Sequence, residues 1–316
     1  MSRILITGVA GFLGSHLCDV LLSDGHEVIG VDNRISGRAA NLDDAFYNDQ
    51  FTFFNHDVTK FIHVRGDLDV VMHLASLASP VFYQEHPIKT LKVGALGTHK
   101  TLGVAKEKDS TYFFASTSEV YGDPEVNPQP EEYRGDVHPY GPRSCYDESK
   151  RYGEAMVRAY RDKHGLDVRV ARIFNAYGPR MRLDDGRVIP NFMKQALIGR
   201  DLTVYGDGSQ TRSFCYVDDL VQGLVGLLES DVKSPVNIGN PDERTILELA
   251  ELIIELTESD SGITYEPLPP QDPQVRRPDI SKAKTTFDWR PSIELRDGLN
   301  RSIPYFDGRI EELDLR

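Results

Sequence analysis

The stretch ILITGVAGFLG, residues 4–14, decides the fold of this chain. Its first part, Ile4–Thr7, is a run of apolar and β-branched residues that predicts a short buried strand. Three glycines with the spacing G-x-x-G-x-x-G follow at once, and apolar residues then recur at helical spacing over Phe12–Ser23. A strand that turns through glycines into a helix is typical of the first half of a βαβ unit, so we expect a parallel sheet.

The three glycines predict a phosphate site at this turn. Gly8 permits the tight turn, Gly11 lets the backbone approach a pyrophosphate, and Gly14 lets the helix pack closely on the strand. The first turn of the helix then offers unpaired N–H groups to the phosphates. The motif therefore predicts a dinucleotide cofactor.

Asp32 favours NAD over NADP as that cofactor. It ends the second predicted strand, Glu27–Asp32, where a carboxylate accepts hydrogen bonds from an adenosine ribose. Arg34 and Arg38 follow closely and could accommodate a 2′-phosphate. Taken with the glycine motif, the position of Asp32 predicts bound NAD.

The alternation of strands and helices continues through the first half of the chain and then loosens after residue 178. Further strands are predicted at Phe51–Asn55, Val70–Leu74, Tyr112–Ala115 and Val168–Ile173, and long or periodic helices at Tyr146–His164, Asp218–Leu228 and Thr245–Leu256, with a short strand at Val236–Gly239. We expect an α/β fold: a Rossmann-type doubly wound parallel sheet with a smaller interleaved α/β domain that binds substrate.

The composition excludes several classes of function. The formal net charge of −13 is unfavourable for nonspecific nucleic-acid binding, which needs a basic face. No apolar run reaches the roughly 18–20 residues that span a bilayer, and the chain enters a strand at Ile4 without the pattern of a signal peptide. Three widely spaced cysteines and nine scattered histidines form no metal-ligand pattern. We therefore expect a cytoplasmic protein without nucleic-acid, membrane or metal partners.

Tyr146 and Lys150 form a candidate catalytic pair. They lie four residues apart and so share one face of a helix. A phenol with its ordinary pKa near 10 is a weak base at neutral pH, but a neighbouring ammonium and a positive nicotinamide lower that pKa. Tyr146 could then take a proton from a substrate hydroxyl as hydride leaves for NAD. Thr117, at the end of a predicted strand, is the third candidate.

These residues, together with Asp57-Val58 and His73–Ser76, resemble the extended short-chain dehydrogenase/reductase family, whose members act on nucleotide sugars. The resemblance covers nearly the whole chain and implies that Thr117, Tyr146 and Lys150 are the catalytic hydroxyl, base and lysine. The cofactor site that it implies comprises Gly8, Gly11, Phe12, Leu13, Gly14, Asp32, Asn33, Asp57, Val58, Leu74, Ala75, Tyr146 and Lys150. The implied division is an NAD-binding Rossmann domain at residues 1–178, with returning segments near 213–240, and a mainly nucleotide-sugar-binding domain at 179–316.

Which reaction follows depends on the stretch STSEVYGD, residues 116–123, where Glu119 stands two residues after Thr117. The 4,6-dehydratases of the family carry an acidic residue where Ser118 stands, and the 4-epimerases usually carry small or neutral residues where Glu119 stands. Longer stretches, among them HLASLASPVFYQEHPIKTLK, CYDESK, ARIFNAYGPRM and DPQVRRPDI, resemble the UDP-glucuronate decarboxylases within that family.

That resemblance implies UDP-glucuronic acid as substrate and UDP-xylose as product. Oxidation at C4′ gives a β-keto acid that loses CO2, the enolate is protonated at C5′, and reduction at C4′ regenerates NAD. We expect Glu119 to lie beside the sugar, where its charge would disfavour the substrate carboxylate or order the water that protonates C5′.

The same resemblance implies further substrate contacts and leaves alternatives open. The residues that would hold the UDP diphosphate, sugar or uridine are Lys92, Asn175, Arg187, Tyr205, Gln210, Arg212 and Arg276. The family pattern usually places Asn where Gly94 stands. Relatives are commonly dimers through two long helices, so a homodimer is expected. The alternatives are a UDP-glucuronate 4-epimerase and a catalytically silent NAD-binding regulator.

Overall fold

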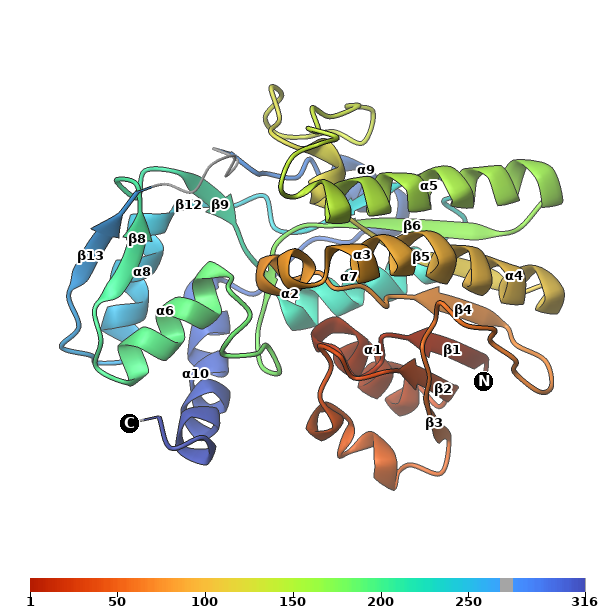
Figure 1. Cartoon of the computed structure of the whole chain (residues 1–316), viewed down its shortest axis with the longest axis horizontal. Coiled ribbons are helices and arrows are strands. Elements are labelled where there is room, and N and C mark those ends of the chain that lie inside the picture. The colour runs from red at the N-terminus through yellow and green to blue at the C-terminus, as the bar shows by residue number, and fades with distance from the viewer. Residues whose placement is uncertain (268–274, 316) are drawn as a thin grey trace.

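A seven-stranded parallel sheet with helices on both faces forms the larger part of the molecule (Figure 1). The computed structural model describes residues 1–267 and 275–315. The strand order is β11-β6-β5-β4-β1-β2-β3, and each neighbouring pair is parallel. These strands are β1 (Arg3–Thr7), β2 (Glu27–Asp32), β3 (Phe51–Asn55), β4 (Val70–His73), β5 (Thr111–Thr117), β6 (Val168–Ile173) and β11 (Val236–Ile238).

Short and long helices cover the two faces of this sheet. One face carries α1 (Phe12–Ser23) and α7 (Val217–Glu229), which contact each other as well as the strands. The other face carries α4 (Thr98–Lys108) and α5 (Ser144–His164). The chain reaches α4 through α2 (Pro80–Glu85), α3 (Pro87–Lys92) and η3 (Val93–Gly97). Among the described residues, η3 is the one π-helical turn. The segments η1 (Ala39–Leu42), η2 (Ala45–Tyr47) and η4 (Ser118–Tyr121) are 3₁₀ turns.

A smaller lobe lies beside the carboxyl ends of the strands, on the left in Figure 1. It contains three two-stranded sheets, β7 (Ala176–Tyr177) with β10 (Cys215–Tyr216), β9 (Thr211–Ser213) with β12 (Glu243–Thr245), and β8 (Leu202–Tyr205) with β13 (Ile263–Glu266). Its helices are α6 (Val188–Leu197), α8 (Ile246–Leu256) and α10 (Leu295–Glu312), and α9 (Ser281–Phe287) contacts β11 and α7. Thr245 and Glu248 form a capping box that begins α8.

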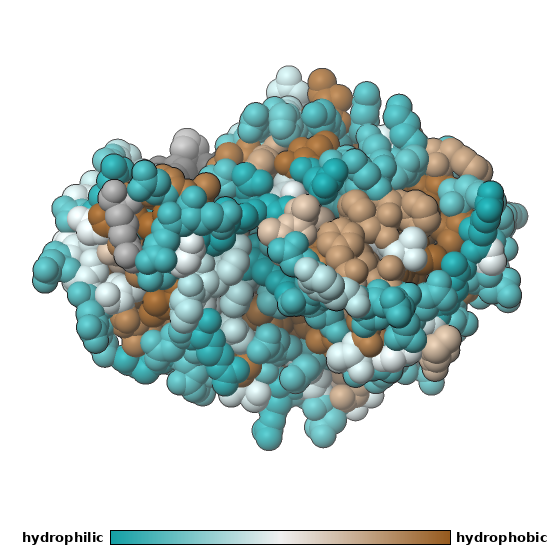
Figure 2. Space-filling view, turned by 90° about the horizontal axis from the view of Figure 1, so that it is seen from below, coloured by the Kyte–Doolittle hydropathy of each residue, from teal (hydrophilic) through white to brown (hydrophobic). Residues whose placement is uncertain are grey.

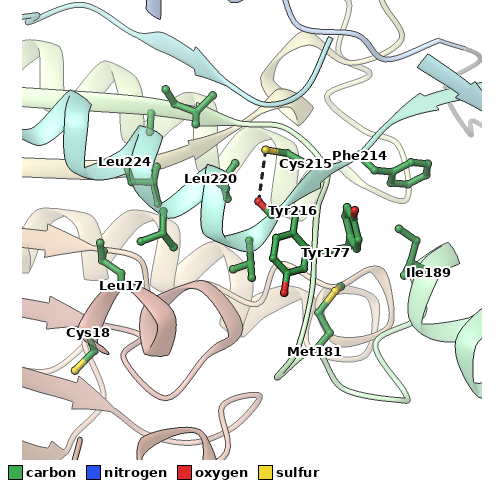
Figure 3. Close-up of a cluster of buried hydrophobic side chains, with 14 of the residues drawn as sticks. Leu17, Cys18, Tyr177, Met181, Ile189, Phe214, Cys215, Tyr216, Leu220 and Leu224 are labelled. Atoms are coloured by element: carbon green, nitrogen blue, oxygen red, sulfur yellow. Dashed lines mark hydrogen bonds between the residues drawn. The ribbon is translucent and has the colours of Figure 1, made fainter. Parts of the chain in front are cut away.

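Successive side chains along the strands pack alternately into two separate hydrophobic cores. In β1, Ile4 and Ile6 face the core under α1 and α7, whereas Leu5 faces the core under α4 and α5. The first of these cores continues into the smaller lobe, where Tyr177 and Ile189 belong to the same cluster (Figure 3). One continuous apolar core therefore joins the lobe to one face of the sheet.

The structure confirms the predicted fold class. Every predicted strand is present, with ends that differ by at most two residues. The strand β5 is the informative case. It runs on past Ala115 to Thr117, because Ser116 and Thr117 pair with β6. The prediction rested on a run of apolar residues, and Ser116 and Thr117 are polar, so the strand was predicted to end at Ala115. The division into domains at residue 178 remains a prediction.

The outer edge of the sheet is apolar and open. β3 is its last strand, and Phe46, Phe54 and Phe61, on and beside it, are more than half exposed. Figure 2, which shows the molecule from below, has apolar side chains gathered on this side. Among the described residues, no helix combines the length and the apolar character needed to cross a membrane.

Candidate active site

A cavity of about 570 Å³ lies at the carboxyl ends of the central strands. In an open parallel α/β sheet, this edge is where ligands bind. Its walls include every residue predicted for the cofactor and for catalysis, together with three of those predicted for substrate, namely Gly8, Gly11, Phe12, Leu13, Gly14, Asp32, Asn33, Asp57, Val58, Leu74, Ala75, Lys92, Thr117, Glu119, Tyr146, Lys150, Asn175 and Arg187. Segments far apart in the sequence thus form one continuous site.

The glycine turn has the shape that a pyrophosphate requires. Gly8 has a φ of +76°, and a Cβ added there would lie 2.7 Å from the backbone nitrogen of Ala75. A Cβ at Gly14 would run into the carbonyl oxygen of Gly8, so α1 packs against the turn only because residue 14 is glycine. The first turn of α1 therefore faces the cavity with bare backbone, and these residues fit the phosphates of NAD.

Asp32 is fixed at the end of β2 by backbone donors. One carboxylate oxygen accepts from the N–H of Ala10 at 3.0 Å and the other from the N–H of Arg34 at 2.6 Å. Burial raises the pKa of Asp32. Each oxygen retains a lone pair, and the residue lies on the cavity wall, so its position fits hydrogen bonds from a ribose.

Thr117, Tyr146 and Lys150 come together at the other end of the cavity. Tyr146 is buried and its hydroxyl is hydrogen-bonded to Thr117. Burial raises the pKa of Tyr146 to about 12. Lys150 donates to the carbonyl of Ala115 at 2.7 Å, and its Nζ lies 5.9 Å from the centre of the Tyr146 ring. Burial lowers the pKa of Lys150 to about 8.

Tyr83 packs against the ring of Tyr146. The two rings are stacked, with centroids 5.3 Å apart and planes inclined by 8°. Tyr83 belongs to α2, and its hydroxyl is buried without a hydrogen-bond partner among the described residues. Sequence reasoning missed this residue, because stacking between distant segments leaves no spacing signal.

Glu119 is held between two arginines. Thr117 caps the short helix η4 by accepting from the N–H of Glu119, which turns the carboxylate toward Arg143 and Arg276. Both guanidinium groups donate to it, one to each oxygen. Burial would raise the pKa of this carboxyl, but the two arginines outweigh it and lower the pKa to about 2. Glu119 is therefore ionised at neutral pH. The sequence suggested that this charge would repel a substrate carboxylate, but in the structure two arginines offset it.

Asp147 is a second carboxyl beside this group. It is 6% exposed, follows Tyr146 in α5, and its Oδ1 has no hydrogen-bond partner among the described residues. Burial and the negative charge of Glu119 raise its pKa to about 7. Neither Asp147 nor Arg143 was singled out in the sequence, where each is an ordinary charged residue next to a motif.

The remaining predicted substrate residues lie in two places. Arg187 lines the cavity and donates to the carbonyl of Ala78 at 3.1 Å. Arg276 reaches the site only through Glu119. Three others lie on the smaller lobe outside the cavity lining, namely Tyr205 at the end of β8, Gln210, whose amide donates to the carbonyl of Tyr205, and Arg212 in β9.

Gly94 lies where η3 and α5 approach each other closely. It is buried in η3, and a Cβ at this position would collide with the Cβ of Ser149 in α5. The departure from the family pattern is therefore matched by a close contact between η3 and the helix that carries Tyr146 and Lys150.

Comparisons with known proteins agree on one family. The model described as "NAD dependent epimerase/dehydratase family" matches residues 4–239. The curated protein named UDP-glucuronic acid decarboxylase 1 of Danio rerio is 54% identical over 98% of this chain and 73% of its own length. A protein of the same name from Arabidopsis thaliana is 51% identical over 98% of this chain and 70% of its own length.

Solved structures show the same architecture. UDP-glucose 4-epimerase of Thermotoga maritima, solved with UDP-glucose, has a TM-score of 0.89 at 30% identity and covers 98% of this chain and 99% of its own. UDP-glucuronic acid 4-epimerase of Bacillus cereus, solved with UDP-glucuronic acid and NAD, has a TM-score of 0.85 at 29% identity, covering 97% and 99%.

Proposed function

Since this chain belongs to the NAD dependent epimerase/dehydratase family, we propose that it converts UDP-glucuronic acid into UDP-xylose and CO2, with NAD regenerated in each cycle. The names of relatives that are 54% and 51% identical support this reaction over epimerisation. The observation that carries the proposal is the Glu119 carboxylate, fixed between Arg143 and Arg276 two residues from Thr117. A sugar with a charged group at C5′ fits beside such a cluster.

NAD, when bound, supplies the acceptor and later the donor of hydride at C4′ of the sugar. Tyr146 takes the proton of the 4′-hydroxyl and later returns it, while Thr117 holds that hydroxyl in line through its own hydrogen bond to Tyr146. Lys150 lies within reach of the ring and stabilises the phenolate by its charge. Burial alone would keep Tyr146 protonated at neutral pH and unable to accept a proton, so Lys150 and the positive cofactor must together lower its pKa.

Loss of CO2 follows from the ketone at C4′. A carboxylate β to a ketone leaves without an acid catalyst, because the ketone accepts the electron pair as an enolate. Arg276 and Arg143 lie behind Glu119, which pairs with both guanidinium groups, and their positive charges would attract the substrate carboxylate. With its pKa near 2, Glu119 orders water at C5′ but does not itself store a proton at neutral pH.

The nucleotide would extend from this point toward the smaller lobe. Lys92, Asn175 and Arg187 line the cavity, which supports their assignment to the diphosphate or sugar. Tyr205 and Gln210 remain proposed uridine contacts, and Arg212 remains a proposed contact of the diphosphate or sugar. This requires the nucleotide to extend out of the cavity between the lobe and the sheet. We keep the homodimer as part of the proposal.

Proton NMR of the protein with UDP-glucuronic acid and NAD in D2O tests the reaction. We expect UDP-xylose with deuterium at C5′, because enolate protonation draws on solvent. Accumulation of a 4-keto pentose would place the reaction in the family but leave the cycle incomplete. Formation of UDP-galacturonate would establish the 4-epimerase instead, and unchanged substrate would refute both.

Tyr146→Phe tests the assignment of the base. Loss of the hydroxyl removes proton transfer, so turnover should fall at least ~100-fold, within the range typical of general bases. Tyr112→Phe is the matched control, because Tyr112 is a buried tyrosine of β5 outside the cavity lining whose hydroxyl bonds to Thr101. Equal losses in both variants would show a general effect of removing a buried hydroxyl.

A further inference from the structure

Two buried oxygens next to the proposed sugar site have no hydrogen-bond partner among the described residues, Asp147 Oδ1 and Tyr83 Oη. A buried polar atom without a partner is uncommon and unfavourable in a folded protein. The two residues lie close enough to influence each other electrostatically, and both flank Tyr146. When a carboxyl group gains a proton, it loses its negative charge and can donate a hydrogen bond. The protonation state of Asp147 therefore changes the charge and the hydrogen bonding beside the proposed sugar site.

The charges around Asp147 come from several elements. The charged groups that face it are Glu119 in η4, Arg143 at the N-cap of α5, Glu148 within α5, and Arg276 in the segment after β13. The phenols of Tyr83 and Tyr146 lie alongside. Glu148 is partly exposed and pairs with Arg151. Apart from Glu148, the charges that act on Asp147 are those of the two arginines and Glu119. These three leave one positive charge in excess when Asp147 is neutral and none when it is ionised.

The geometry points to Asp147 as the holder of the proton that the reaction consumes. We propose that Asp147 takes up this proton as UDP-glucuronic acid binds and releases it after CO2 has left. The neutral form of Asp147 leaves the positive charge that complements the substrate carboxylate, and UDP-xylose has no such carboxylate. This inference rests on the proposed function.

The step balances in atoms and charge. The bond between C5′ and the carboxyl carbon breaks, CO2 leaves, and the electron pair stays on the sugar as the enolate. A new C5′–H bond then forms with a proton delivered through water that Glu119 orders, and Asp147 becomes a carboxylate. Asp147 is outside the cavity lining, so it is a positioning residue and regains its proton from solvent when the next substrate binds.

Substrate affinity should therefore depend on pH, and product affinity should not. An anion bound near Asp147 raises its pKa further, because like charges disfavour ionisation. Below the pKa of about 7 in the free protein, Asp147 already carries its proton and binding is independent of pH. Above it, binding must draw a proton from solvent, so the Kd of UDP-glucuronic acid rises by up to about tenfold per pH unit.

Isothermal titration calorimetry of the NADH-loaded protein at pH 7.5 measures this proton directly. NADH prevents oxidation of the substrate, and two buffers with different ionisation enthalpies reveal proton uptake. We expect more than about half a proton with UDP-glucuronic acid and none with UDP-xylose. Asp147→Asn should abolish the uptake and flatten the pH dependence of Kd, whereas Glu148→Gln, which removes a carboxylate one residue further along, should behave as wild type.

Two results would overturn the assignment: equal proton uptake with both ligands, or uptake that persists in Asp147→Asn. The comparison of the two ligands uses only the wild-type protein, so it decides the question even where Asp147→Asn does not fold. The calorimetry involves no turnover. Failure of the NMR experiment to yield UDP-xylose would therefore count against the proposed reaction and not against proton uptake by Asp147.

Discussion

The charge of Glu119 shows how much the surroundings of one residue decide. In the sequence it is a carboxylate in a row of hydroxyls. In the structure it receives Arg143 from the start of α5 and Arg276 from a segment more than 150 positions away. A carboxylate shielded from water is much more stable when charged donors bond both of its oxygens than when it has no partner. Removal of one member of such a cluster is strongly destabilising, because the remaining charges are left uncompensated.

Glu119 should make the protein sensitive to acid. Its pKa is about 2 in the folded chain against an ordinary value of 4.5, so its contribution is complete above pH 4.5 and is lost as the pH falls toward 2. The shift corresponds to about 3 kcal/mol of unfolding free energy. Chemical denaturation across this range should show Glu119→Gln less stable by roughly that amount at pH 7 and nearly equal to wild type at pH 2.

The exposed pair of Glu255 and Arg296 provides the control. Glu255→Gln should leave the pH dependence unchanged, because an exposed ion pair is screened by water. A slope that is the same in wild type and in Glu119→Gln would contradict the assigned ion-pair cluster.

At this scale the sequence predicted the residue types and missed their partners. Gly8, Asp32, Tyr146 and Lys150 follow local rules of spacing, and the structure brings them to one cavity. Arg143, Tyr83 and Asp147 act through contacts with residues on other segments. Such contacts depend on the tertiary fold, and one sequence contains no local signal for them.

At the scale of elements, the contact between η3 and α5 is tightly constrained. Gly94 permits it, since any side chain there would meet the Cβ of Ser149. Ser149 belongs to α5, which also carries Tyr146 and Lys150. The glycine that stands in place of the usual Asn therefore permits close helix packing in this chain.

Gly94→Asn should destabilise the protein and weaken turnover, because α5 must shift to admit the side chain; overpacking of a buried site typically costs about 1–3 kcal/mol. Removal of the opposing side chain should relieve the strain, so Gly94→Asn combined with Ser149→Gly should recover much of the loss. Denaturant midpoints of the two single variants and the double variant form the cycle that measures this. Strictly additive losses would show that the two positions do not oppose each other.

The elements themselves were largely predictable. Amphipathic spacing gave α1 and the helix that follows Tyr216, and apolar runs gave the strands of the sheet. The small strands of the second lobe and the π-helical turn at η3 were not predicted, because two- or three-residue strands and single turns have no periodicity to read. Their formation depends on neighbours that only the assembled lobe supplies.

For the whole molecule, the continuous core predicts a single unfolding event. The buried cluster that includes Leu17 in α1 extends through Leu220 in α7 to Ile189 in the smaller lobe (Figure 3). Phe192 and Leu299 of that lobe belong to the same cluster. Neither part can lose its packing without exposing apolar surface of the other. Differential scanning calorimetry should give one transition, which NAD shifts to higher temperature as a ligand of the native state. Two separated transitions would show that the lobe melts independently.

The place of β11 has a consequence for how the chain is made. This strand completes the sheet beside β6, and α7 covers α1, although both lie beyond residue 215. During synthesis on the ribosome, the first 178 residues therefore emerge with an open strand edge at β6 and an uncovered apolar face. Unpaired edges of this kind favour association between chains. A nascent or truncated chain that stops near residue 178 would thus depend on chaperones, whereas one that reaches residue 238 can close its own sheet.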